Sequence, residues 1–273
     1  MARNQYNLAI LPNAATVAGD YPVWKAANGI PVAAAFGVNK TMDSLSTERV
    51  AQTLQQLFNE AEQADRALME QFTDAEISGQ SLGEVLSEHL ARESRDLRGF
   101  YRGYVDNFLN VTPEYGRFLY QCARVRKATR IVEFGTSMGV STLYLAAALR
   151  DMGGGHLIST ELEPTKAARA HVNLEAAGLA DLVNIRVGDA RETLVDVGGN
   201  VDLVLLDGAF SLYLPVLKLL EPHLQTGTPI LAENAFNHDS EYLTYVRNPA
   251  NGYFSQAISI NAGRGNEFTV VTR

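Results

Sequence analysis

The stretch Ile131–Ala148, IVEFGTSMGVSTLYLAAA, decides the fold of this chain. It opens with a β-branched apolar run that ends at Glu133 and continues into a turn bounded by Gly135 and Gly139. From Val140 onward, apolar residues recur at the spacing of a helix. A strand, a glycine turn and a helix in this order open a nucleotide-type α/β fold, in which the turn's backbone closely approaches a ligand.

The spacing of the glycines separates two kinds of nucleotide site. A dinucleotide fingerprint is G-x-G-x-x-G, and Ser137 occupies the position of its second glycine. The pattern is therefore E-x-G-x-x-x-G, which disfavours an NAD(P) dehydrogenase, and no catalytic Ser-Tyr-Lys set is evident either. A glycine pair alone also fits a tight turn in an unrelated α/β domain, so the assignment depends on the downstream sequence.

The composition restricts the class of protein. A chain of 273 residues that is 46% apolar suits one domain with an elaboration, or two unequal domains. A formal net charge of -8 and a pI near 5.2 argue against a nucleic-acid binder. No apolar run is long enough to span a bilayer, and the start lacks a signal-peptide layout. With Cys122 as its single cysteine, the chain is expected to be cytoplasmic and without a disulfide or cysteine-based metal cage.

The chain before the deciding stretch is predicted to be mainly helical. Residues 1–45, with their prolines and glycines, are predicted to form an irregular arm that either packs on a subunit surface or closes over a substrate. From Ser46, a favourable N-cap, an apolar stripe beginning at Val50 predicts a long helix. Shorter helical patterns complete a cap or dimerisation region over 46–110, in which the charge run Arg92–Arg98 is interpreted as a solvated face.

After Ile131, predicted strands and helices alternate with short connections, as a doubly wound sheet requires. The further strands are predicted at 156–160, 182–187, 201–206 and 229–232, and the helices at 165–177, 190–195, 212–224 and 240–247. Two β runs, 254–260 and 268–272, follow with no helix between them and predict an antiparallel hairpin. The predicted fold class is therefore α/β, a Rossmann-like seven-stranded sheet with a C-terminal antiparallel hairpin, preceded by a helical region.

Polar residues stand at the carboxyl ends of the predicted parallel strands, where such sheets bind ligands. They are Glu133, Glu161, Asp189, Asp207, Glu233 and Asn234. Glu161 can accept two hydrogen bonds from a ribose diol, or favour the dipole of the following helix. Asp189 can accept an adenine amino hydrogen, or cap the short helix that begins at Ala190. Asp207 closes the most apolar strand, so we expect it to face a ligand ammonium, a metal ion, or an arginine or lysine.

Five segments in order resemble class I S-adenosylmethionine (SAM) O-methyltransferases of the catechol and caffeoyl-CoA type. They are IVEFGTSMGVSTLYLA, STELEP, VGDARETL, VDLVLLDGAF and ILAENAF. The resemblance covers about residues 110–273 and implies a SAM-binding domain over 111–273. The cofactor-binding residues that it implies, together with those read from the strand ends, are Val111, Thr112, Glu133, Gly135, Ser137, Gly139, Ser141, Glu161, Asp189, Ala190 and Asp207. The metal ligands that it implies are Asp207, Glu233 and Asn234.

The chain departs from this family's pattern at two positions. The family usually has an aspartate where Glu233 stands, and its catalytic lysine, three residues after the first metal ligand, falls on Phe210. The proton of the acceptor hydroxyl must therefore be lost through acidification by the metal or to another base. The predicted base is His238, just past Asn234, with a solvated loop histidine as the alternative, and the predicted catalytic residues are Asp207 and His238. Structural roles are predicted for His89, His156, His171 and His223.

The sequence thus predicts a SAM-dependent O-methyltransferase that transfers a methyl group to a hydroxyl of a small aromatic or natural-product acceptor. The all-oxygen ligand set predicts assistance by a divalent cation, Mg²⁺ by preference. The family resemblance also implies a homodimer. Two alternatives stay open: a metal-independent SAM enzyme with N- or C-methylation or non-methylating chemistry, and a non-catalytic SAM-binding or interaction protein.

Overall fold

A computed structural model describes residues 43–68, 70, 82–235, 240–260 and 265–273 of this chain. Nearly all of the predicted arm, residues 1–45, lies outside the described residues, and so does the predicted base His238. None of the helices within the described ranges has both the length and the apolar character needed to cross a membrane.

The described residues form one mixed sheet with seven strands in the order β3-β2-β1-β4-β5-β7-β6. The strands are β1 (Arg130–Phe134), β2 (His156–Glu161), β3 (Val183–Val187), β4 (Leu203–Leu206), β5 (Pro229–Ala232), β6 (Tyr253–Ile258) and β7 (Asn266–Val271). β1 to β5 pair in parallel, whereas β7 is antiparallel to both β5 and β6. The predicted fold class and its C-terminal hairpin are confirmed.

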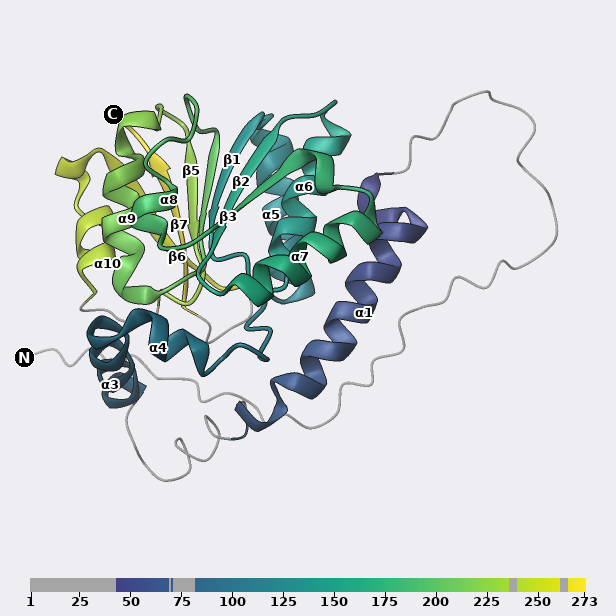
Figure 1. Ribbon diagram of the computed structural model, residues 1–273. Helices are drawn as coiled ribbons and strands as arrows, with labels where there is room; N and C mark the ends of the chain where they lie inside the picture. Colours follow the sequence, from purple (N-terminus) through teal and green to yellow (C-terminus); the bar gives the residue numbers. More distant parts are fainter. Residues whose placement is uncertain (1–42, 69, 71–81, 236–239, 261–264) are drawn as a thin grey trace, which may run out of the picture. The chain divides into compact units, whose positions relative to one another are not determined.

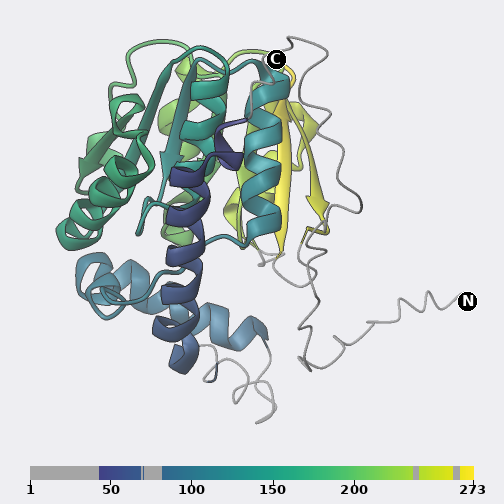
Figure 2. The same ribbon diagram turned by 90° about the vertical axis from the view of Figure 1, so that its right-hand side faces the viewer.

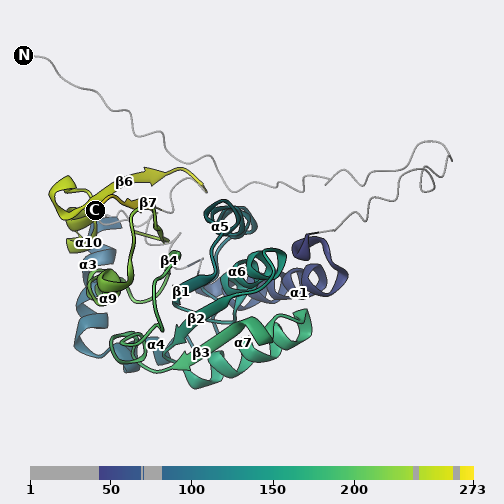
Figure 3. The same cartoon turned by 90° about the horizontal axis from the view of Figure 1, so that it is seen from above.

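Helices cover both faces of this sheet (Figure 1 and Figure 3). One face carries α5 (Pro113–Arg126), α6 (Val140–Asp151) and α7 (Pro164–Ala177), and the other carries α8 (Ala190–Thr193), α9 (Tyr213–Leu220) and α10 (Glu241–Val246). Helix α1 (Glu48–Ala64) forms an outer layer on α6 and α7 (Figure 2). The strand order changes direction between β1 and β4, which is where open sheets of this kind bind ligands.

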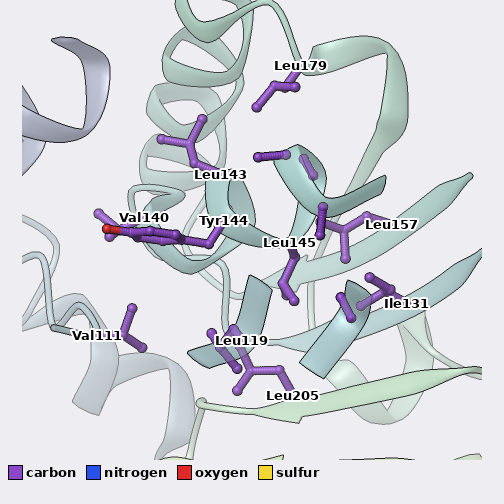
Figure 4. Packing of buried hydrophobic residues seen from close by; sticks show 14 of the residues in the cluster. Val111, Leu119, Ile131, Val140, Leu143, Tyr144, Leu145, Leu157, Leu179 and Leu205 are labelled. Atoms are coloured by element: carbon purple, nitrogen blue, oxygen red, sulfur yellow. The ribbon is translucent and has the colours of Figure 1, made fainter. Parts of the chain in front are cut away.

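Two apolar cores lie on opposite faces of the sheet, and β4 contributes to both because successive side chains of a strand point to opposite faces. Leu203 and Leu205 join the core under α5 and α6. Val204 and Leu206 join the core under α9. Figure 4 shows Leu205 beside Leu119 of α5 in the first core. The continuous apolar run of β4 therefore follows from burial on both faces.

Several predicted helix boundaries are wrong, and two of them have a clear local reason. Helix α1 begins at Glu48 rather than at Ser46, because Ser46 belongs to a short 3-10 turn whose N-cap is Asp43. The helix predicted over 212–224 ends at Leu220, and a 3-10 turn follows that contains Pro222. Proline has no amide hydrogen to continue the helical bonding, which explains the early end.

Two further helices, α3 (Leu82–Arg95) and α4 (Leu97–Arg102), pack against each other. Helix α3 also contacts η3 (Phe210–Leu212), a 3-10 turn just after β4. These two helices, which we call the cap, therefore meet the sheet at the carboxyl end of its parallel strands (Figure 1). The cap is thereby next to the edge at which the sequence predicts the site.

Candidate active site

The glycine loop, residues 135–139, joins β1 to α6 and lies tightly against its neighbours. Gly135 has φ +103°, and a Cβ there would lie 2.1 Å from the carbonyl oxygen of Asp207. Gly139 has φ +89° and is the N-cap of α6, and a Cβ there would lie 3.2 Å from Cβ of Ala170. Both positions need glycine because the backbone is left-handed, and at Gly135 also because the end of β4 is too close for a side chain.

Glu161, at the end of β2, fixes the middle of this loop. Its Oε2 accepts a hydrogen bond from the Ser137 amide at 2.7 Å, and its Oε1 accepts one from the Glu163 amide at 2.9 Å. Burial raises the pKa of Glu161, although these bonds and the charge of Lys166 oppose the shift. A carboxylate has about four acceptor positions, so Glu161 can hold the loop and still accept from a ligand.

Lys166 of α7 is a residue at this edge that the sequence did not single out. Its side chain is buried, with Nζ 3.3 Å from Ser137 Oγ, and Ser137 Oγ donates to the Phe108 carbonyl oxygen. Burial lowers the pKa of Lys166, against the opposing charges of Glu161 and Asp65. Asp65 in turn accepts from the Phe108 amide at 2.8 Å. The C-cap of α1, a residue of α7 and the segment before α5 thus support the glycine loop from outside.

Glu133 and Ser141, both predicted to bind the cofactor, lie against each other. The fully buried Glu133 carboxylate accepts from Ser141 Oγ and Thr142 Oγ1 at 2.6 Å each, and from Ser159 Oγ at 2.5 Å. Burial raises the pKa of Glu133 to about 7, although the three hydroxyls oppose the shift. This carboxyl group therefore ties the end of β1 to α6 and β2 from inside. Thr142 and Ser159 were not predicted, because their contribution depends on which way each hydroxyl points.

Asp189 takes the alternative role considered for it, the N-cap of α8. Its Oδ1 accepts from the Arg191 amide at 2.9 Å, and its Oδ2 accepts from the Arg191 guanidinium at 2.6 Å. The hydrogen bond from Arg191 lowers the pKa of Asp189.

At the other side of the site, Thr112 caps α5 by accepting from the Tyr115 amide at 3.3 Å, and Val111 beside it is buried.

Asp207 and Glu233 directly follow the adjacent strands β4 and β5. The Leu206 carbonyl accepts from the Glu233 amide at 2.9 Å, so the two acids continue the paired register. The following residue, Asn234, has φ 55°, and its amide donates to the Asn266 side chain at 3.1 Å. The three residues implied as metal ligands therefore lie at the carboxyl ends of neighbouring strands.

Two buried tyrosines face these acids. The Tyr213 hydroxyl donates to the Glu233 carbonyl oxygen at 2.7 Å. Burial, reinforced by the charges of Glu233 and Asp207, raises the pKa of both Tyr115 and Tyr213 well above the ordinary value. Tyr115 and Tyr213 belong to the cores on opposite faces of the sheet.

The ligand set of this edge suits a hard divalent cation. Within the described ranges, no group of three or more His, Cys, Asp and Glu side chains could hold a metal ion. The set of Asp207, Glu233 and Asn234 consists of two carboxylates and one amide, so it offers only oxygen ligands. Mg²⁺ is commonly held by one or two carboxylates, with water completing the octahedron, and the residues present fit that pattern.

The cap meets this edge through Glu93, which corrects the interpretation of Arg92–Arg98 as a wholly solvated face. The Glu93 side chain has no solvent exposure, and its carboxylate accepts from the Ser211 amide at 2.7 Å and from the Tyr101 hydroxyl at 3.0 Å. Phe210, which stands where the family has its lysine, packs against Tyr213 with 5.9 Å between ring centroids. The sequence carries no signal for the Glu93 contact, since its partner is 118 residues away.

The fold and this edge are similar to those of class I methyltransferases, and a comparison of sequences relates part of the chain to the same proteins. Residues 132–235 match the family model of a methyltransferase domain. The chain is 35% identical over 130 residues to a catechol O-methyltransferase of Niastella koreensis, a match that covers 46% of this chain and 58% of that protein. It is 40% identical over 98 residues to a catechol O-methyltransferase of Mycobacterium tuberculosis, covering 36% and 44%. The chain thus spans about half the length of these relatives.

The similarity to a solved structure covers most of both chains. The O-methyltransferase TomG of Streptomyces achromogenes, involved in tomaymycin synthesis and solved in complex with SAM, is 25% identical with a TM-score of 0.53. The match covers 68% of this chain and 90% of TomG. The resemblance to SAM-dependent O-methyltransferases of the catechol and caffeoyl-CoA type is confirmed.

Proposed function

We propose that this protein is a SAM-dependent O-methyltransferase that methylates a hydroxyl of a small aromatic or natural-product acceptor with the help of a divalent cation. The observation that carries the proposal is the close approach of Gly135 to the backbone of Asp207. It joins the loop that would receive the charged cofactor to the acid that would hold the acceptor's cation. Methyl transfer requires these two sites side by side, because the acceptor oxygen must attack in line with the sulfonium methyl.

The cofactor half of the site would use the glycine loop and the acid at the end of β2. Glu161 would accept from the ribose hydroxyls while it holds Ser137, and the backbone of the loop would lie against the methionine end. Val111 and Thr112 would cover the cofactor, and the Asp189–Ala190 turn would meet the adenine. Glu133 would not contact the cofactor directly but would fix the start of α6.

The acceptor half would hold the cation between Asp207, Glu233 and Asn234. When bound, the cation lowers the pKa of an acceptor hydroxyl and orients it. The aromatic side chains of Tyr213 and Phe210 lie beside this edge and suit a planar acceptor. Catechol, which appears in the names of the two relatives, is therefore the first acceptor to test.

The test has two parts. SAM is titrated into the full chain by calorimetry, and transfer to catechol is then followed with Mg²⁺ and with a chelator. We expect SAM binding, loss of transfer with chelator, and a fall of about 100-fold in kcat/KM for Asp207→Asn, since even outer partners of metal ligands are worth 10- to 100-fold. No SAM binding would favour an interaction protein, and transfer that survives the chelator would favour the metal-independent alternative.

Several expectations from the sequence stay predictions. They are the homodimer, the cytoplasmic location, and the division into an arm (1–45), a cap or dimerisation region (46–110) and a SAM-binding domain (111–273). Light scattering of the full chain tests the first. The use of His238 as a base is likewise untested, because it lies outside the described residues.

A further inference from the structure

A histidine of the cap lies beside a buried carboxylate next to the acceptor edge. On α3, His89 Nε2 lies 3.3 Å from Glu93 Oε2, one helical turn away. The Glu93 side chain has no solvent exposure, and its other oxygen accepts from the Ser211 amide at 2.7 Å. Because Glu93 is tied to η3, the His89 ring has a fixed position relative to the end of β4.

The His89 ring contacts the residue that replaces the family's lysine. Its centroid lies 5.2 Å from that of Phe210, with 38° between the ring planes. On another side, Phe100 of α4 meets it edge-on at 4.7 Å. Phe210 is only three residues after Asp207, so an imidazole from a distant part of the chain contacts the side chain that stands at the position of the family's lysine.

The charged partner of His89 is the Glu93 carboxylate. Within the described chain, α3 packs against α4 and η3, and the titratable groups near the ring are Glu93 and Tyr101, with Arg92 over the Phe100 ring at 5.3 Å. Burial alone would raise the pKa of Glu93, but hydrogen bonds from His89, Ser211 and Tyr101 outweigh it and lower the pKa. An ionised carboxylate beside an imidazole stabilises the imidazolium that forms when the ring accepts a proton.

We infer that His89 is the general base of the methyl transfer and that Glu93 is its positioning residue, an inference that rests on the proposed function. His89 takes the proton from the acceptor hydroxyl as the acceptor oxygen forms a bond to the methyl carbon of SAM. The bond between that carbon and sulfur breaks, and its electron pair stays on sulfur, which becomes a neutral thioether. The structural role predicted for His89 from the sequence is the alternative to this chemical one.

The chain contains a matched control. On α7, His171 Nε2 and Glu175 Oε1 form the same one-turn pair at the same 3.3 Å, but their side chains are 58% and 60% exposed. His171→Gln therefore makes the same chemical change on a helix surface.

The experiment compares kcat against pH for catechol methylation, with Mg²⁺ present, in the full-length protein and three variants. For His89→Gln we expect kcat to fall about 100-fold or more at neutral pH, the usual contribution of a general base, and the acidic limb of the profile to disappear. For Glu93→Gln we expect a smaller loss and an acidic limb moved to lower pH, because the imidazolium has lost its carboxylate. His171→Gln should match the wild type in both.

SAM affinity, measured by calorimetry, distinguishes a failure of the inference from a failure of the proposed function. We expect it to be unchanged in His89→Gln, so that the loss lies in transfer alone. A variant with wild-type kcat and an intact acidic limb overturns the inference but not the proposed function, and so does a variant that loses SAM binding, since His89 would then support the fold. A wild-type protein that does not bind SAM overturns both.

Discussion

Glu133 and Glu161 end neighbouring strands of the sheet, yet their surroundings are opposite. The Glu133 carboxyl is fully buried and accepts from three side-chain hydroxyls. The Glu161 carboxylate is partly exposed and accepts from two backbone amides, one in the glycine loop and one at the start of α7. Both groups are raised in pKa by burial. The difference lies in their partners, and from it we infer that Glu133 serves the fold whereas Glu161 serves the ligand.

The glycine loop connects the two acids and is the place to disturb both at once. In Gly135→Ala, the new Cβ would lie 2.1 Å from the Asp207 carbonyl oxygen on a backbone with φ +103°. A left-handed L-residue costs about 1–2 kcal/mol, and overpacking adds about 1–3 kcal/mol. We expect the free energy of unfolding in urea to fall by about 2–5 kcal/mol, and SAM binding to be lost with the loop's shape.

Gly153→Ala is the control for this change. Its φ is +94°, but a Cβ there would meet nothing within 4 Å. Only the backbone cost of about 1–2 kcal/mol should remain, and SAM affinity should be unchanged. Equal losses in the two variants would show that the contact with Asp207 does not restrict the loop.

Titration of Glu133, the buried member of the pair, should make the free energy of unfolding depend on pH. Because the pKa of Glu133 is raised from 4.5 to about 7, the native state holds a proton that the unfolded chain releases in this range. The contribution of this group is complete below pH 4.5 and is lost as the pH rises to about 7. The loss is on the order of 2–3 kcal/mol at 1.36 kcal/mol per pKa unit.

Glu133→Gln removes the titration while keeping the shape of the side chain. Between pH 5 and pH 7.5, urea unfolding of the wild type should therefore lose on the order of 2–3 kcal/mol more than unfolding of the variant. The neighbouring hydroxyls can turn to accept from the new amide group. Parallel pH profiles for the two proteins would mean that Glu133 does not carry the proton assigned to it.

The sequence predicted the parts of this site that depend on local spacing. Gly135 and Gly139 are four residues apart at a strand-to-helix turn, and such a turn forces a left-handed backbone whatever the rest of the chain does. The ends of the strands could be found in the same way, so Glu161 and Asp207 were placed correctly at one edge. Parallel register then brought Asp207 beside Glu233.

The parts that the sequence did not predict depend on contacts across long separations. The burial of Glu93 requires η3 to lie against α3, and nothing in a charge run tells which of its members a distant turn will cover. The two uses of Glu133 and Glu161 could not be separated either, because the position of an acid along a strand does not show where its carboxylate points. Ser159 and Lys166 acquire their roles only when β2 and α7 are placed beside the loop.

Glu161, the partly exposed member of the pair, should show the smallest effect, and the effect should be on SAM binding. Glu161→Gln keeps an oxygen for one amide but loses the charge that strengthens both hydrogen bonds and any from a ribose. Charged hydrogen bonds exceed neutral ones by about 1–1.5 kcal/mol, so we expect the Kd for SAM to rise about tenfold. Glu163→Gln, two residues further on, makes no side-chain cap bond to α7 and should change the Kd less than about twofold. If the two variants bind SAM equally well, Glu161 serves the fold as Glu133 does, and the contrast between the two acids disappears.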